Sequence, residues 1–75
     1  MLLVEDEQKL ATAIARQIER ARCEVTLAYD GETALESVTT EEIHLAILDI
    51  DLPGISGMDV LQQLRARSYD IRILL

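Results

Sequence analysis

The chain has 75 residues, of which 49% are hydrophobic, so it can hold one small domain at most. Fourteen acidic residues against seven basic ones give a net charge of −7, which argues against a nucleic-acid-binding surface, since that would need a basic patch. A single cysteine excludes an intrachain disulfide and argues against a cysteine-based metal site. No apolar run approaches the length of a membrane span and no signal-peptide pattern is present, so we predict a soluble, cytoplasmic protein.

The chain begins with a predicted strand and a predicted helix. Residues 1–4 form a short apolar run of the kind found in buried strands, and the acidic stretch 5–7 breaks it. A helix is predicted over about residues 7–22, with Asp6 at the N-cap position. Its apolar face follows spacings of three and four: Leu10, Ala11, Ile14, Ile18 and Ala21.

A second strand and a second helix follow. Apolar and polar residues alternate over 23–27, which predicts a half-exposed strand near a sheet edge. Asp30 stands where it can cap a helix over about residues 32–39. We expect that helix to bury three side chains: Ala34, Leu35 and Val38.

The strongest predicted strand is 43–48, which is nearly all apolar and therefore expected to be covered on both faces. A loop rich in proline and glycine follows, and Ser56 is expected to cap a third helix over about residues 58–67. The inner face of that helix is predicted to carry Met58, Leu61 and Leu64. Residues 71–75 begin a fourth predicted strand.

The predicted element order is β-α-β-α-β-α-β. Strands that alternate with helices imply a parallel sheet covered on both faces, so we predict an α/β protein with a flavodoxin-like, doubly wound sheet. The last residues are an apolar run that would leave a bare sheet edge, which natural domains avoid. We therefore interpret the fold as truncated after the start of the fourth strand.

Carboxylates follow two of the predicted strands. Glu5 and Asp6 come directly after the first strand and Asp49 after the third, and these strands are neighbours in a flavodoxin-like sheet. Because the carboxyl ends of parallel strands share one edge, the three acids should meet there. Their repulsion raises their pKa values unless a cation neutralises them, and hard oxygen ligands suit Mg²⁺. A carboxylate is also a nucleophile that can form an acyl phosphate.

Each acid also has a simpler interpretation. A lone acid after a strand is more often a helix cap or a solvated loop residue. That interpretation suits Glu5 well, Asp6 less and Asp49 least, because an acid that closes an apolar strand is costly to place without compensation. Asp51, two residues further, is predicted to be loop surface.

Four stretches together form a recognisable pattern: LLVEDE (2–7), VTLAYDGETALE (25–36), LAILDIDLPGISG (45–57) and MDVLQQLRAR (58–67). With this pattern the sequence resembles the receiver domain of bacterial response regulators over nearly its whole length. The combination is specific, because an acidic pair after the first strand and a D-x-x-x-P-G-x-x-G loop after the third rarely occur together by chance. The sequence pattern of residues 52–75 is most similar to that of receivers in winged-helix, OmpR-like transcriptional regulators.

The resemblance implies a role for each acid. Asp49 would be both the phosphoacceptor and a metal ligand. Asp6 would bind Mg²⁺ directly, Glu5 would support the metal, and the backbone carbonyl of Asp51 would complete the protein ligands. The phosphoryl group would come from a sensor histidine kinase, and the receiver itself would catalyse the transfer. The domain would be a signalling module of a two-component system, not an enzyme in its own right. It would relay the signal to an output domain, and it could dimerise.

Some family features are absent or different. Arg22 stands where the family often has glycine, and Ser56 where aspartate or asparagine is frequent. By spacing, the family's switch Ser/Thr, its lysine and its last two helices would lie beyond residue 75. We therefore expect residues 1–75 to be an incomplete receiver domain, in which the apolar face of the first helix loses part of its cover.

Two alternatives remain open on the residues alone. The chain could be a truncated, non-switching interaction module of receiver ancestry, since fold alone does not fix function. It could also be a haloacid-dehalogenase-like phosphatase, whose first motif is an apolar strand that runs into D-x-D. The phosphatase fits less well, because Leu52 and Pro53 follow the motif, which comes after two βα units, and Glu5 and Asp6 are left unexplained.

Overall fold

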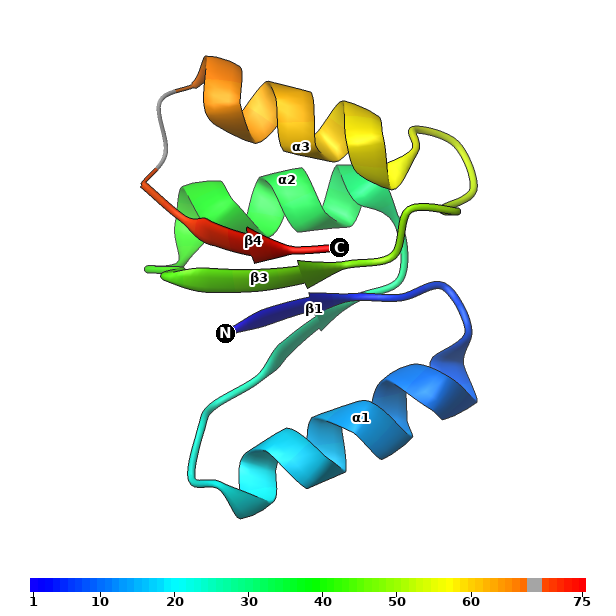
Figure 1. Ribbon diagram of the computed structural model, residues 1–75, viewed down its shortest axis with the longest axis vertical. Helices are drawn as coiled ribbons and strands as arrows, with labels where there is room; N and C mark the ends of the chain where they lie inside the picture. The colour runs from blue at the N-terminus through cyan, green and yellow to red at the C-terminus, as the bar shows by residue number, and fades with distance from the viewer. Residues whose placement is uncertain (68–69) are drawn as a thin grey trace.

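Four parallel strands form one sheet, in the order β2-β1-β3-β4 (Figure 1). The computed structural model describes residues 1–67 and 70–75. The elements are β1 (Leu2–Val4), α1 (Gln8–Arg20), β2 (Thr26–Ala28), α2 (Gly31–Thr40), β3 (Leu45–Leu48), α3 (Gly57–Ala66) and β4 (Arg72–Leu74). The predicted α/β fold with flavodoxin-like strand order is therefore confirmed.

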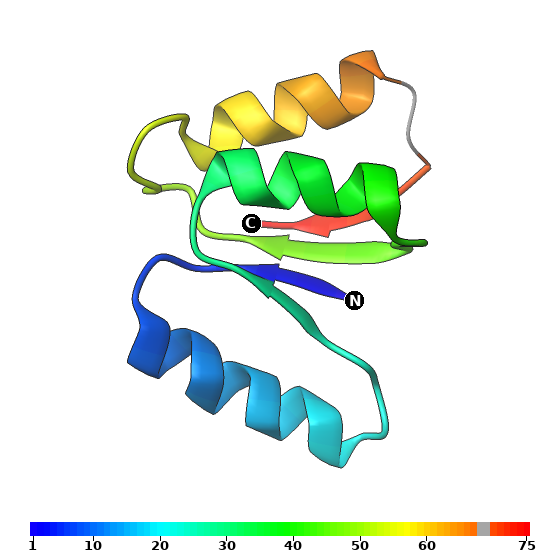
Figure 2. The same cartoon turned by 180° about the vertical axis from the view of Figure 1, so that it is seen from behind.

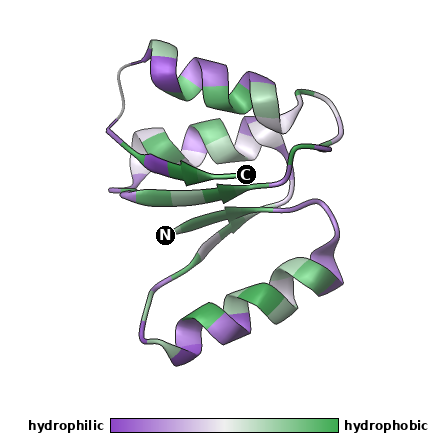
Figure 3. Cartoon of the chain, viewed as in Figure 1, coloured by the Kyte–Doolittle hydropathy of each residue, from purple (hydrophilic) through white to green (hydrophobic). Residues whose placement is uncertain are grey.

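The helices cover the two faces of the sheet unequally. Helices α2 and α3 lie on one face and α1 lies alone on the other, as the two opposite views show (Figures 1 and 2). Helix α2 contacts β1, β2 and α3, whereas α1 contacts β1. The strands are mostly hydrophobic, and each helix mixes hydrophobic with hydrophilic residues (Figure 3). This pattern is typical of a sheet that buries both faces under amphipathic helices.

The main core lies between the sheet and the α2–α3 layer. Its buried members come from β1, β2, β3, α2 and α3 and from the segments beside them: Leu2, Val4, Ala28, Ala34, Leu35, Val38, Ile43, Ala46, Leu48, Leu52, Val60, Leu64 and Ile71. A smaller group lies under α1, where Leu3, Ala11 and Ala15 are buried. The larger apolar residues on α1 are less covered, since Leu10 is 43% exposed and Ile14 is half-buried.

Helix α1 begins differently from the prediction. Glu7, not Asp6, is the N-cap, and its side chain makes no capping hydrogen bond. The helix also stops at Arg20, and Arg22 then has a positive φ of 62°. The predicted strand over 23–27 was wrong in its bounds, because β2 pairs with β1 only over Thr26–Ala28.

The other two helices begin as predicted. The Asp30 side chain accepts a hydrogen bond from the Thr33 backbone N–H at 2.7 Å. The Ser56 hydroxyl accepts one from the backbone N–H of Asp59. The Asp59 carboxylate in turn accepts one from the backbone N–H of Ser56, which completes a capping box. The inner face of α3 was predicted wrongly at Met58, which is 42% exposed.

Leu64 is buried as predicted, and Val60, which was not predicted, is fully buried beside it on the inner face of α3. Strand β4 pairs with β3 and lies at the other edge of the sheet from β2. Among the described residues, no helix combines the length and the apolar character that crossing a membrane requires.

Candidate metal centre

Backbone pairing brings two of the predicted acids level with each other. Val4 and Leu48 are register partners at the ends of β1 and β3. The pairing extends one residue further, because the N–H of Asp49 donates to the Val4 carbonyl at 3.0 Å and the N–H of Glu5 donates to the Ala28 carbonyl at 3.0 Å. Glu5 and Asp49 therefore leave the sheet at the same edge, on neighbouring strands.

The third acid completes a cluster at this edge. Glu5, Asp6 and Asp49 each offer a carboxylate oxygen, and these oxygens all lie within 4.8 Å of one another. Glu5 and Asp49 are half-buried and Asp6 is exposed. The predicted meeting of the three carboxylates is thus confirmed. Oxygen donors of this kind and spacing fit a hard cation such as Mg²⁺, with its other positions left to water.

The electrostatics of the cluster favour a bound cation. Burial raises the pKa of Glu5 above its ordinary value, and the nearby carboxylates of Asp49 and Asp6 raise it further. The backbone N–H of Glu7 opposes this rise by donating to Glu5 Oε1 at 3.2 Å. A cation at this point would relieve both the repulsion and the cost of burying the charge.

Asp49 and Asp51 occupy different environments. One oxygen of Asp49, Oδ1, accepts a hydrogen bond from the backbone N–H of Asp51 at 3.1 Å, which turns the chain sharply after β3. The Asp51 side chain is exposed, as predicted for loop surface. The use of its backbone carbonyl as a metal ligand stays a prediction.

Two glycines shape the loop between β3 and α3. Gly54 has a φ of 74°, a backbone conformation that residues other than glycine rarely adopt. Gly57 approaches the backbone of Asp49 so closely that a Cβ would collide with it, and its N–H donates to the Ile50 carbonyl at 3.0 Å. The prediction that both glycines serve backbone geometry is confirmed.

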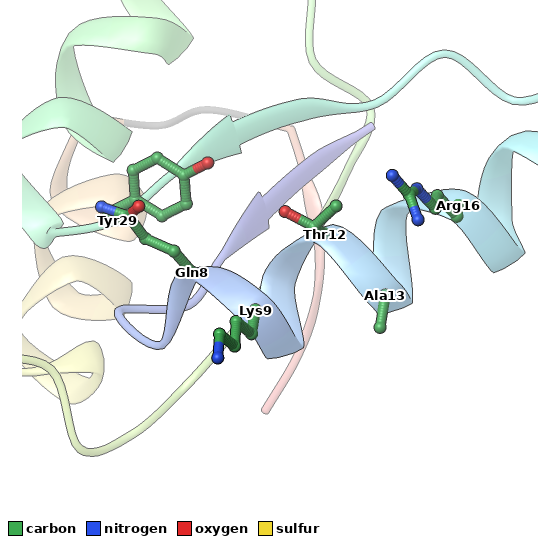
Figure 4. A pocket seen from close by; sticks show the side chains of 6 residues that line it. All are labelled: Gln8, Lys9, Thr12, Ala13, Arg16 and Tyr29. Carbon is green, nitrogen blue, oxygen red and sulfur yellow. The ribbon is translucent and has the colours of Figure 1, made fainter.

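A separate depression on the surface was not predicted. It is open, has a volume of about 420 Å³, and lies between the first half of α1 and the residue that follows β2 (Figure 4). Its lining residues are Gln8, Lys9, Thr12, Ala13, Arg16 and Tyr29. None of the three clustered acids lines it, so it is distinct from the candidate metal centre. Helical periodicity could not reveal it, because its lining joins α1 to a residue from another element.

The fold and the acidic edge together define a doubly wound α/β domain with a cluster of three carboxylates at its switch point. A sequence profile of the family described as the response regulator receiver domain matches residues 1–75. The chain belongs to this family, as its resemblance predicted. It is homologous to the response regulators of two-component systems.

Transcriptional regulators are among the relatives of the chain. It is 37% identical over 75 residues to the alkaline phosphatase synthesis transcriptional regulatory protein PhoP of Bacillus subtilis. The aligned region covers 100% of this chain and 31% of that protein. It is 43% identical over 68 residues to the sensory transduction protein RegX3 of Mycolicibacterium smegmatis. That alignment covers 91% of this chain and 30% of that protein. The chain therefore spans about a third of the length of these curated relatives.

Solved structures agree with the family. The response regulator TrrA of Thermotoga maritima, crystallised in complex with Mg²⁺ and BeF, matches with a TM-score of 0.93 and 34% identity over 99% of this chain and 64% of that chain. A second structure holds the histidine kinase ThkA in complex with TrrA, and it matches with a TM-score of 0.89 and 33% identity over 96% of this chain and 62% of the matched chain.

Proposed function

We propose that this chain receives a phosphoryl group on Asp49 with the help of Mg²⁺. The observation that carries the proposal is the cluster of Glu5, Asp6 and Asp49 at the carboxyl edge of two neighbouring strands. The Mg²⁺ and BeF of the TrrA complex support the same chemistry in a structural relative. Burial, together with the neighbouring carboxylates of Asp49 and Asp6, raises the pKa of Glu5, and a bound cation would stabilise its charged form.

Each acid has its own part in the proposed transfer. An oxygen of the Asp49 carboxylate attacks the phosphorus of a phosphohistidine, the P–N bond breaks, and its electron pair stays with the imidazole. The product is an acyl phosphate on Asp49. Glu5, Asp6 and Asp49 would hold Mg²⁺ together with the backbone carbonyl of Asp51. The metal, when bound, neutralises charge on the phosphoryl oxygens and on the attacking carboxylate.

We also propose the partners of the whole protein. The phosphodonor is a sensor histidine kinase, a partner type supported by the complex of ThkA with TrrA. The output is a DNA-binding domain of the winged-helix type, supported by the transcriptional regulators among the relatives. Residues 1–75 then form the first part of a receiver domain, in line with their 64% coverage of the TrrA chain. The protein works in the cytoplasm, where such a kinase domain and DNA both occur.

The test is phosphorylation of the 75-residue chain by acetyl phosphate in the presence and absence of Mg²⁺. Intact-mass measurement should show one added phosphoryl group, dependent on Mg²⁺, and peptide mapping should place it on Asp49. Asp49→Asn should abolish the modification. Asp51→Asn is the matched control, because it removes a carboxylate from the same loop and keeps the backbone carbonyl.

Three outcomes would contradict the proposal. Labelling that persists in Asp49→Asn would place the chemistry elsewhere. A folded chain that takes up no phosphoryl group would favour the non-switching interaction module. Steady turnover of a generic phosphomonoester would favour the phosphatase.

A further inference from the structure

Helix α2 begins with a glycine that its own backbone does not require. Gly31 is the first residue of α2, and the Asp30 cap already fixes the start of that helix. Its φ lies outside the left-handed region, since Gly54 alone among the described glycines has a positive φ. Glycine is unfavourable in a helix relative to alanine, so its presence here needs another reason.

Space is that reason. A Cβ on Gly31 would lie 2.5 Å from Ile55 Cγ1, 3.0 Å from Ile55 Cδ1 and 2.8 Å from Val60 Cγ2. Ile55 belongs to the loop between β3 and α3, the loop that carries Asp51, and its side chain packs against the main core. The first residue of α2 therefore supports this loop directly. Helices α2 and α3 begin at the same end of the sheet, which makes the contact possible (Figures 1 and 2).

The next residue of α2 approaches the same loop at a second glycine. A Cβ on Gly54 would lie 3.3 Å from Glu32 Oε1. Successive residues of α2, Gly31 and Glu32, thus approach the loop at successive residues, Ile55 and Gly54. Only the approach at Gly31 requires the absence of a Cβ, because the exposed Glu32 side chain can shift away from Gly54.

The end of the loop that joins α3 is fixed by hydrogen bonds, so its backbone has little freedom to move. The capping box holds Ser56, and Gly57 is hydrogen-bonded to Ile50. Isoleucine is branched at Cβ and stiff about χ1, so rotation of Ile55 would replace one branch with the other at the same place. We therefore expect a methyl group at position 31 to push on Ile55 and so to displace the loop that carries it.

We propose that the contact between Gly31 and Ile55 is a positioning contact for the metal centre. It sets how far the loop stands from the carboxylate cluster, and hence where the Asp51 carbonyl lies relative to Mg²⁺. Gly31 and Ile55 touch neither metal nor phosphate in this role. The inference rests on the proposed function, which supplies the metal and the use of that carbonyl.

The test is Mg²⁺ binding to the folded 75-residue chain, measured by isothermal titration calorimetry without a phosphodonor. Gly31→Ala should weaken Mg²⁺ binding by about tenfold, the low end of the effect of changing an outer-shell partner of a metal site. The matched control is Val38→Ala, which also changes a buried position of α2 but lies two turns from the loop. It should lower the stability of the chain and leave its Mg²⁺ affinity unchanged.

A double variant separates positioning from general damage. Ile55→Ala alone should also weaken Mg²⁺ binding, because the loop loses its contact with α2. In Gly31→Ala/Ile55→Ala the new methyl occupies part of the space vacated by isoleucine, so Mg²⁺ affinity should recover relative to either single variant. Such non-additivity is the signature of two residues that act through one contact.

The outcomes distinguish this inference from the proposed function. If the unaltered chain binds no Mg²⁺, the proposed function and the positioning contact both fail. If it binds Mg²⁺ and Gly31→Ala binds it equally well, only the positioning contact fails. If Gly31→Ala does not fold, Ile55→Ala decides the question, and unchanged Mg²⁺ affinity in that variant would overturn the contact's role.

Discussion

Arg22 adopts a backbone conformation that suits glycine. Its φ is 62°, and it is the one non-glycine residue with positive φ among the described residues. It follows the C-cap of α1, and its N–H donates to the Glu19 carbonyl at 2.9 Å. A left-handed residue at this place is a common way to end a helix, and glycine serves it without steric cost.

Replacing this residue should therefore stabilise the chain. Arg22→Gly is expected to raise the free energy of unfolding by about 1 kcal/mol, because it removes the strain of a left-handed side-chain-bearing residue. Urea unfolding followed by circular dichroism measures the change. Arg20→Gly is the control, since Arg20 lies in the helix and glycine there should cost about 1 kcal/mol. Equal losses in both variants would contradict the explanation.

The Asp30 cap should make stability depend on pH in a defined direction. The backbone N–H of Thr33 donates to Asp30 and lowers its pKa below the ordinary value of 3.8. A lowered pKa in the folded state adds stability that is complete above 3.8 and is lost as the pH falls through the folded value. Asp30→Ala should therefore lower the melting temperature clearly at neutral pH and much less in strong acid.

Ser56→Ala is the matched control for this prediction. Ser56 caps α3 with a neutral hydroxyl, so its loss should cost about 1 kcal/mol at either pH. Thermal unfolding at neutral and acidic pH, followed by circular dichroism, compares the two variants. A pH-independent loss in Asp30→Ala would show that its charge has no part in the cap.

Helix α3 shows how packing chooses among apolar residues on one helix. Leu64 is 1% exposed and Val60 is fully buried, whereas Met58 in the first turn is 42% exposed. The sequence spacing of Met58, Leu61 and Leu64 is helical, but the buried stripe is centred on Val60 instead. The capping box at Ser56 and the close approach of Gly57 to Asp49 constrain the first turn of α3. The rotation of the helix about its axis, and so the choice of buried residues, follows from this constraint.

Two truncations should differ sharply on this helix. Leu64→Ala is expected to cost about 3 kcal/mol, because it leaves a cavity in the main core. Met58→Ala should change the free energy of unfolding by less than about 0.5 kcal/mol, because much of that side chain is already in solvent. Denaturant unfolding of both variants measures the difference. Similar costs for the two would mean that α3 packs through Met58 after all.

The stability of the whole chain should be small and should depend on Mg²⁺. A chain of this size buries little surface relative to its exposed area, and Leu74 and Leu75 are each 57% exposed. We expect a low free energy of unfolding without metal. Mg²⁺ at about a hundred times its dissociation constant should add about 2.7 kcal/mol, because it binds the folded chain and not the unfolded one.

Asp6→Asn provides the control for the metal effect. It should abolish the stabilisation by Mg²⁺ while leaving the metal-free chain at least as stable, because it removes one of three mutually repelling charges. Melting temperatures with and without Mg²⁺ test both points. A rise with Mg²⁺ that persists in Asp6→Asn would point to a site elsewhere on this acidic chain.

Much of the architecture could be read from local patterns. The order of strands and helices, the capping by Asp30 and Ser56, and the placement of acids after β1 and β3 are all local features of the sequence, and the structure contains them. The meeting of Asp49 with Glu5 could also be predicted, because parallel strand order alone brings their strand ends together.

Other features were decided only by tertiary structure. Periodicity shows that a helix has an apolar face but not which residue of that face meets the sheet, so Met58 was misplaced on α3. Asp6 was predicted both to cap α1 and to join the carboxylate cluster, and the structure shows it in the cluster with Glu7 as the N-cap. The contact between Gly31 and Ile55 joins the first residue of α2 to a loop that is distant in sequence. Local propensity acts within a few residues, whereas these features depend on how separate elements pack against one another.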